Sequence, residues 1–114
     1  MAISSDEIRG YIDAIILVRL EKGDSYGYEI NKEVRRLSGG LYEMKEATLY
    51  TAFRRLEDGF LIRSYWGDGD GGARRRYYHI TDRGRKALSE MLESYNETRA
   101  ILDRLLFEGG ENDA

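Results

Sequence analysis

The sequence predicts a mainly α-helical fold with one small β-hairpin, which places the chain in the α+β class. Two observations carry this prediction. Apolar residues recur at spacings of three and four up to about residue 58 and again after residue 81, as they do on one face of an amphipathic helix. Between these stretches, two short runs rich in aromatic and branched residues flank a loop of glycines and aspartates, as the strands of a hairpin do.

The first helix is expected to begin within residues 4–7, where hydroxyl side chains that cap a helix precede acids that suit the positive end of its dipole. Gly23 is expected to end it. Its apolar face is too broad for a helix that is half in water, which indicates burial. This face consists of Ile8, Tyr11, Ile12, Ile15, Ile16 and Leu20.

The second helix is expected to follow a cap at Asp24 or Ser25 and to end at the glycine pair 39–40. Its apolar residues are spaced by four, four and three, which is a helical stripe. They are Tyr26, Ile30, Val34 and Leu37.

A third, short helix is expected from Glu46, and Gly59 is placed to end it in a left-handed cap. Leu49, Phe53 and Leu56 share its apolar stripe. The side chains outside this stripe are Thr48, Tyr50, Thr51, Arg54 and Arg55. Short polar groups and guanidinium groups suit a helix that enters the major groove of DNA. The alternative for this segment alone is an ordinary surface helix of a helical bundle.

The hairpin is expected to pair residues 61–66 with residues 74–80 across the loop 67–73. Its second strand opens on three arginines, which makes the hairpin a candidate wing against DNA phosphates. Alternation along the strand puts Arg74 and Arg76 on one face and turns Arg75 elsewhere, toward an acid.

The aromatic residues Trp66, Tyr77 and Tyr78 are expected in the core of the hairpin or in an interface, and His79 in a structural role.

The last helix is expected to begin after an N-cap at Thr81 and to run to about Phe107. Its apolar seam has the spacings of a heptad and is too long for the preceding elements to cover. The seam consists of Leu88, Met91, Tyr95, Thr98, Leu102 and Leu105. A second copy of the same helix is the simplest cover, so we expect a homodimer. The alternative is a helix that folds back on its own domain.

The order of these elements is that of a winged helix-turn-helix domain, expected over residues 1–80, followed by a dimerisation helix over residues 81–108. Residues 109–114 are expected to form a disordered tail. The net charge of the chain is −3, but residues 45–86 carry +4 and residues 87–114 carry −5. DNA affinity follows the local field, so the basic middle is the part expected to touch DNA.

Several classes of protein are excluded by composition. The chain has no cysteine and one histidine, which excludes disulfides, thiolate metal sites and histidine clusters. No catalytic constellation is present, so we expect no enzyme, cofactor or metal. The longest apolar run, residues 14–18, is far too short to span a membrane, and a signal peptide is not evident. We therefore expect a cytoplasmic protein without membrane contact.

Four motifs together resemble those of the PadR family of transcriptional regulators. They are YGYEI (26–30), ATLY (47–50), RRLEDGFL (54–61) and GARRRYYHITDRG (72–84). The resemblance covers about residues 8–107, and the short last helix is similar to the compact branch of the family, which includes multidrug-responsive regulators. It implies a homodimeric repressor that binds an inverted-repeat operator in double-stranded DNA. Thr51 departs from the proline that many members have there.

The resemblance also implies a pore for planar aromatic compounds at the dimer interface. Two copies of Tyr95 across a dyad would leave such a slot, with plain packing of this residue as the alternative. Arg99 departs from an acid found in a drug-binding member, which disfavours cationic drugs. The expected lining is Ala14, Leu88, Met91, Leu92, Tyr95 and Arg99.

The leading hypothesis is a dimeric repressor with the helix at 46–58 in the major groove and the hairpin near the flanking backbone. The residues expected to contact DNA are Ser25, Tyr26, Lys32, Thr48, Tyr50, Thr51, Arg54, Arg55, Arg74 and Arg76. Two alternatives remain open. One is a winged-helix module that binds proteins and not DNA, and the other is an enzyme whose site is assembled across the dimer.

Overall fold

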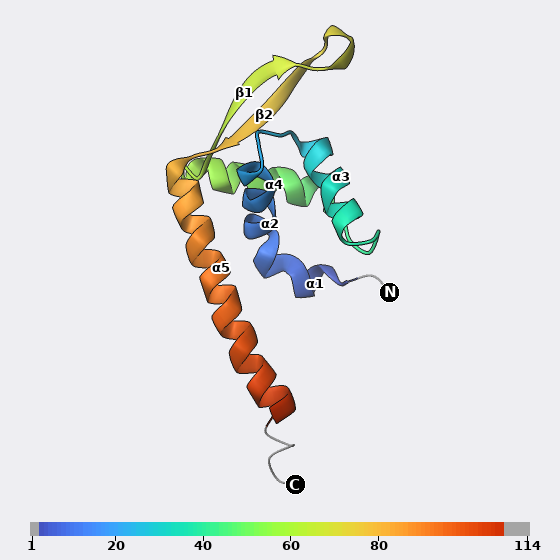
Figure 1. Ribbon diagram of the computed structural model, residues 1–114. Coiled ribbons are helices and arrows are strands. Elements are labelled where there is room, and N and C mark those ends of the chain that lie inside the picture. Colours follow the sequence, from blue (N-terminus) through green and yellow to red (C-terminus); the bar gives the residue numbers. More distant parts are fainter. Residues whose placement is uncertain (1–2, 109–114) are drawn as a thin grey trace.

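The computed structural model describes residues 3–108 and confirms a mainly helical chain with one two-stranded antiparallel sheet (Figure 1). The elements in chain order are α1 (Ser5–Ile8), η1 (Arg9–Tyr11), α2 (Ile12–Glu21), α3 (Gly27–Leu37), α4 (Glu46–Asp58), β1 (Ile62–Asp68), η2 (Asp70–Gly72), β2 (Arg74–Ile80), α5 (Asp82–Asp103) and η3 (Arg104–Glu108). The tail expected at residues 109–114 lies outside the described residues. Within residues 3–108, no helix combines the length and apolarity needed to cross a bilayer.

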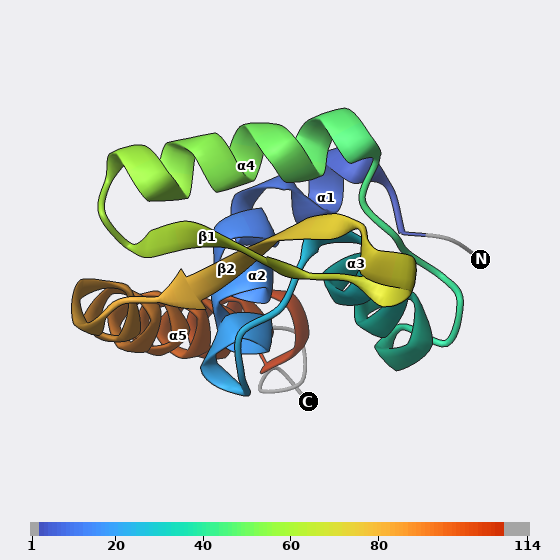
Figure 2. The same cartoon turned by 90° about the horizontal axis from the view of Figure 1, so that it is seen from above.

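The core surrounds α2, which lies between α4 on one side and α5 on the other (Figure 2). Ile16 and Leu17 of α2 are fully buried, as the broad apolar face of this helix predicted. The base of the hairpin belongs to the same core, because Tyr78 of β2 stacks on Phe53 of α4 with the ring centroids 3.9 Å apart. Packing therefore ties the inner end of the hairpin to α4.

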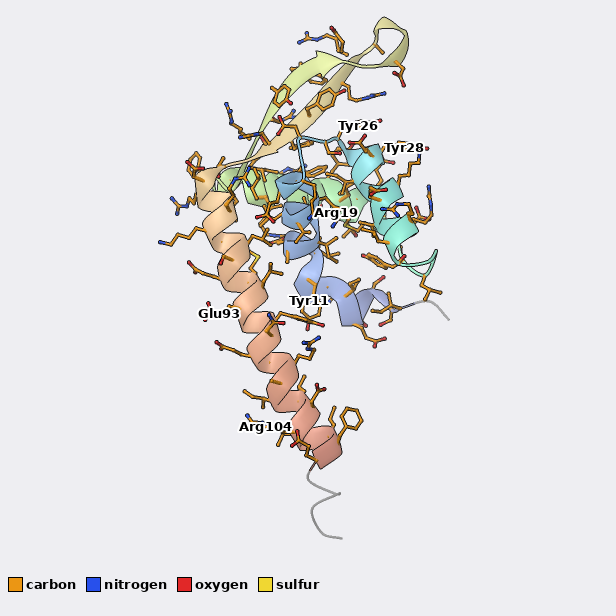
Figure 3. All side chains as sticks on the ribbon, viewed as in Figure 1. Tyr11, Arg19, Tyr26, Tyr28, Glu93 and Arg104 are labelled. Carbon is orange, nitrogen blue, oxygen red and sulfur yellow. The ribbon has the colours of Figure 1, made fainter. Side chains whose placement is uncertain are left out.

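The first helix is interrupted, so the prediction of one continuous helix is wrong. Ser4 caps α1 as expected, its hydroxyl accepting a hydrogen bond from a backbone N–H at 3.2 Å. The 3₁₀ segment η1 follows and contains Gly10, a residue with low helix propensity. Tyr11 ends the break and reaches α5 (Figure 3), where it meets the ring of Tyr95 edge-on with the centroids 5.4 Å apart.

The turn between α2 and α3 bonds to the hairpin and does not cap α3, so the predicted cap at Asp24 or Ser25 is wrong. Tyr26 occupies the N-cap position and makes no side-chain cap bond. The backbone of Ser25 pairs with that of Tyr78 in an isolated bridge, with N–H···O distances of 3.2 and 2.8 Å. Asp24 turns its carboxylate toward the hairpin.

The end of α4 also differs from the expectation. The left-handed residue is Phe60, with φ of 60°, and not Gly59, whose φ of −85° is ordinary. The N–H of Leu61 reaches back to the carbonyl of Leu56 at 3.0 Å, which closes the helix in a Schellman-type end. At the end of α3 the expected stop is present, because Gly39 and Gly40 both have positive φ.

The hairpin pairs β1 with β2 from Ile62 opposite Ile80 to Asp68 opposite Arg74. The second strand has the predicted bounds, while the first continues two residues beyond Trp66. The hairpin projects from the helical body at the end opposite to the free end of α5 (Figure 1).

Helix α5 begins as predicted, with the Thr81 hydroxyl accepting a bond from the N–H of Gly84 at 3.0 Å. A Cβ at Gly84 would overlap the carbonyl oxygen of Leu61, so only glycine fits this junction. The outer part of α5 and η3 extends away from the body and accounts for a radius of gyration of 17.0 Å, against about 13 Å for a compact chain of this size. Its exposed large apolar residues are Leu92, Tyr95, Ile101, Leu102, Leu105, Leu106 and Phe107.

Candidate nucleic-acid interface

Helix α4 has one buried apolar face and one exposed polar face. The buried residues are Leu49, Ala52, Phe53 and Leu56. All five residues of α4 that the sequence analysis expects at DNA are exposed, namely Thr48, Tyr50, Thr51, Arg54 and Arg55. The structure thus leaves uncovered the face that would have to enter a groove.

Tyr50 belongs to this face but is also fixed by its neighbours. Its ring meets Phe53 at a steep angle of 74° with the centroids 5.5 Å apart. A Cβ at Gly27, the first residue of α3, would lie 2.9 Å from the Tyr50 hydroxyl. The glycine therefore lets the start of α3 lie against Tyr50 and Leu49 of α4, which gives a physical reason for it in the YGYEI motif.

The two neighbouring arginines of α4 differ in their surroundings. Arg55 makes a two-fold contact with Asp13 of α2: its Nε lies 3.2 Å from Oδ2, and its Nη2 bonds Oδ1. This hydrogen-bonded carboxylate raises the pKa of the Arg55 guanidinium. Arg54 has no ion pair in the part of the chain that the structure describes, residues 3–108. Arg54 is consequently the arginine of α4 whose charge is available to a ligand.

The hairpin shows the same division between its arginines. The strand register confirms that Arg74 and Arg76 share one face, and Trp66 lies on it too. Arg76 donates to the Ser64 hydroxyl at 2.8 Å and pairs with Glu57 of α4 at 3.3 Å. The guanidinium of Arg74 lies 5.4 Å from the centre of the Trp66 ring, and no ion pair of it occurs among residues 3–108.

Trp66 itself is 55% exposed, so it does not pack in the core of the hairpin. Tyr77 and Tyr78 do pack within the chain, as expected, since Tyr77 is half-buried and Tyr78 is buried. Trp66 is the one aromatic of the three that a partner can reach easily.

The opposite face of the hairpin packs on the start of α3. Arg75 points to this side, as predicted, with its guanidinium 4.0 Å from the centre of the Tyr26 ring and 4.0 Å from Asp70. Tyr77 meets Tyr26 edge-on at 5.6 Å and stacks on Tyr65 at 5.7 Å. Figure 3 shows Tyr26 at the N-terminal end of α3, below the hairpin. These rings and Arg75 connect the wing to the helix-turn-helix.

The three residues around α3 that were expected to touch DNA lie in different environments. Ser25 is only 7% exposed and donates its hydroxyl hydrogen bond to Glu29, so its side chain is turned inward. The ring of Tyr26 packs against Tyr77 and Arg75 of the hairpin. Lys32 is exposed on α3. Of the three, Lys32 presents a charge to solvent.

Asp24 forms a cluster that the sequence analysis did not anticipate. Its Oδ2 accepts a hydrogen bond from the Tyr65 hydroxyl at 2.6 Å, and its Oδ1 lies 2.8 Å from Nδ1 of His79. Burial alone would raise the pKa of the Asp24 carboxyl, but the bonds from Tyr65 and His79, helped by the charges of His79 and Arg63, outweigh it and lower the pKa. His79 thus has a structural contact, as expected.

The six residues expected to line a ligand slot differ in how deeply they are buried. Leu88 is 1% exposed and belongs to the core of its own chain, so it lines no slot while α5 packs in this way. Ala14 and Met91 are partly buried against the core. Leu92, Tyr95 and Arg99 are exposed, and the guanidinium of Arg99 lies 5.8 Å from the Tyr95 ring centre.

The sequence analysis did not predict the contacts of four side chains with α4, α5 or the hairpin. These are Tyr11, Asp13, Asp24 and Glu57. Three of them contact partners far along the chain; Asp13 bonds a residue 42 positions away and Asp24 one 55 positions away. No periodicity or local spacing reports such contacts. For Glu57, an acid shortly after the arginine pair in the helix that the sequence analysis expects at DNA was the available signal.

Comparison with known proteins gives a consistent result. The family model of the transcriptional regulator PadR-like family matches residues 16–90. An uncharacterized protein from Lysinibacillus sphaericus is 43% identical over 109 residues, which cover 96% of this chain and 99% of that protein.

Two solved structures are similar over most of their length. A transcriptional regulator from Clostridium thermocellum is 47% identical, with a TM-score of 0.84, covering 92% of this chain and 99% of that one. A PadR family transcription regulator from Clostridium difficile is 37% identical, with a TM-score of 0.74, covering 84% of this chain and 98% of that one.

Proposed function

Since the chain belongs to the PadR-like family of transcriptional regulators, we propose that it represses transcription as a homodimer bound to an inverted-repeat operator, acting in the cytoplasm. The family is one of DNA-binding regulators and not of enzymes. The proposal concerns which surface binds, in what assembly, and with what effect on transcription.

The observation that carries the proposal is the exposed face of α4. Thr48, Thr51 and Arg54 lie on a short helix whose other face is fully buried, so this surface is presented on a rigid support. A helix of this kind enters the major groove with its polar side chains toward the base edges. Arg54 is proposed to read a base or a phosphate there.

The hairpin is proposed to lie beside the flanking backbone as the wing. Arg74 offers its charge near the tip, and Trp66 offers an exposed ring on the same face. Phosphate contacts of this kind position a protein on the duplex without reading sequence.

Dimerisation through α5 is proposed because its outer half leaves a long row of apolar side chains in water. Leu102, Leu105 and Leu106 are each exposed by roughly half or more. Soluble monomers rarely expose contiguous apolar patches of this kind, and a two-fold copy of the same helix would cover them.

A planar aromatic molecule between the α5 helices is proposed as the inducer. Tyr95, 42% exposed, stands between the edge of Tyr11 and the guanidinium of Arg99. A ligand there releases DNA only if it binds one arrangement of the dimer better than the other. Quenching of tyrosine fluorescence by planar dyes, lost in Tyr95→Ala, is the expected result; no binding of any dye would refute this part of the proposal.

The DNA-binding proposal is tested with a fluorescent duplex taken from upstream of the protein's own gene. We expect the logarithm of the binding constant to fall linearly with the logarithm of the salt concentration, because phosphate contacts release counterions. Binding that is absent, or insensitive to salt, would favour the alternative of a winged-helix module that binds proteins and not DNA. Sedimentation at micromolar concentration tests the assembly, and a monomer would refute the dimer.

A further inference from the structure

The outer part of the hairpin needs support from outside the sheet. Ile62, Tyr78 and Ile80 anchor its inner end in the core. Beyond them the sheet has only two strands, with Arg75 and Tyr77 packed on Tyr26 at the start of α3, and an isolated two-stranded hairpin is marginally stable in water. A wing that must place a charge at a defined point on DNA therefore requires further contacts.

One such contact comes from Asp24, in the turn between α2 and α3. Its carboxylate bonds both strands, because Oδ2 accepts from Tyr65 of β1 at 2.6 Å and Oδ1 lies 2.8 Å from Nδ1 of His79 of β2. Tyr65 and His79 share one face of the hairpin by register. Arg63 of β1 adds a positive charge that favours the ionised form of the Asp24 carboxylate.

A second carboxylate contact comes from Glu57, near the end of α4. Its Oε2 accepts a hydrogen bond from the Ser64 hydroxyl of β1 at 2.9 Å, and its Oε1 accepts from Nη2 of Arg76 of β2 at 3.3 Å. Ser64 and Arg76 lie on the hairpin face opposite to Tyr65 and His79.

The two carboxylates are equivalent in design. Each uses one oxygen for β1 and the other for β2, and they grip opposite faces of the hairpin. Asp24 belongs to the turn of the helix-turn-helix, while Glu57 belongs to α4, three residues after Arg54. We call this pair the wing staples. They join the hairpin to both parts of the DNA-facing domain.

We infer that the wing staples Asp24 and Glu57 are positioning residues that set the wing relative to α4 for DNA binding. This inference rests on the proposed function. Electrostatics alone predicts the opposite behaviour, because deleting an acid near DNA reduces repulsion and strengthens binding. A loss of affinity on deleting either carboxylate is therefore a signature of positioning.

The Glu57 arm of the test uses three variants. Glu57→Ala is expected to weaken binding to the duplex about tenfold, equivalent to 1.4 kcal/mol. Glu57→Gln keeps a carbonyl that accepts from Ser64 or Arg76, so it should recover most of the affinity. Asp58→Ala removes the same charge from the adjacent exposed position and should not weaken binding.

The Asp24 arm follows the same plan. Asp24→Ala is expected to weaken binding by a similar factor, and Asp24→Asn, whose carbonyl still accepts from Tyr65, should recover most of it. Glu21→Ala is the matched control, an exposed acid at the end of α2. Thermal melts and sedimentation confirm that each variant is folded and assembled as the wild type is.

A second readout needs no DNA. Trp66 is the single tryptophan of the chain and lies on the wing, so the fast component of its fluorescence anisotropy decay reports local motion at the wing, apart from the slower tumbling of the whole molecule. We expect faster and wider motion in Glu57→Ala and Asp24→Ala than in the controls. Unchanged anisotropy, or alanine variants that bind DNA as tightly as the wild type or more tightly, would overturn the inference. Failure of the wild type to bind DNA would instead overturn the proposed function, while the anisotropy still decides whether the carboxylates hold the wing.

Discussion

Helix α4 and the hairpin each present a pair of arginines on an exposed face, and in each pair one arginine is held and the other is not. Arg55 is bound by Asp13, and Arg76 is bound by Glu57. Arg54 and Arg74 have no ion pair within residues 3–108. The two elements have unrelated backbones, yet the same arrangement appears in both.

The difference within each pair shows that neighbouring residues of one type do not have one role. An arginine whose donors are engaged by a carboxylate must give up part of that pair before it can bind a phosphate. An unengaged arginine loses only side-chain freedom. We therefore expect the unheld members to dominate DNA affinity and the held members to contribute to the architecture.

The largest effect is expected at Arg54. Arg54→Ala should reduce affinity for the operator by about 1–3 kcal/mol if the side chain reads a base edge. Arg55→Ala should cost less, measured by anisotropy titration of the same duplex. Equal losses would break the distinction between held and unheld arginines.

The next effect concerns the wing. Arg74→Ala should weaken binding nearly equally for all sequences and reduce the salt slope by about 1, because one phosphate contact is lost. Arg76→Ala should change the slope less, since its charge is already paired with Glu57. Titrations at four salt concentrations, with operator and scrambled duplexes, measure both; a larger slope change for Arg76→Ala would reverse the assignment.

A smaller effect is expected from the pair that holds Arg55. Asp13→Asn should lower the free energy of unfolding by about 0–1 kcal/mol, since both partners are partly in water. Calorimetry in low and high salt measures this, and Asp6→Asn, which disrupts an exposed pair with Arg9, is the control. A large loss of stability would mean that the Arg55 pair is a main support of α4.

The smallest effect is a pH dependence from Asp24. The pKa of the Asp24 carboxyl is lower in the folded chain than in the unfolded chain. The ionised carboxylate therefore stabilises the fold at pH values above its ordinary pKa near 3.8. That contribution is lost as pH falls through the lowered folded value. The melting temperature of the wild type should therefore fall more steeply between pH 5 and pH 2.5 than that of Asp24→Asn. Parallel curves of melting temperature against pH would contradict the contact of Asp24 with the hairpin.

Much of the fold was accessible from the sequence because it follows from local periodicity. The stripe of Leu49, Phe53 and Leu56 defined α4, and alternation around a glycine-rich loop defined the hairpin. Thr81 marked the start of α5. In each case the signal and the element occupy the same few residues.

The errors and omissions arose where the cause lies elsewhere in the chain. The 3₁₀ break at Tyr11 accompanies a ring on α5, and the left-handed Phe60 stands beside a glycine that favours that conformation more strongly. Within the candidate site, the exposed side chains of α4 were predictable from its helical period. The carboxylates that hold Arg55 and Arg76 were not, because each is brought to its partner by tertiary packing.

The glycine at the start of α5 has a mechanical consequence. Since no side chain separates Gly84 from Leu61, the helix is seated directly on the backbone that leads into β1. The 22 residues of α5 form a lever about 33 Å long, so a tilt of about 5° at this fulcrum moves the free end by about 3 Å. By this geometry, a displacement of about 3 Å at the far tip of α5 corresponds to a change in angle of only about 5° at the base of the wing.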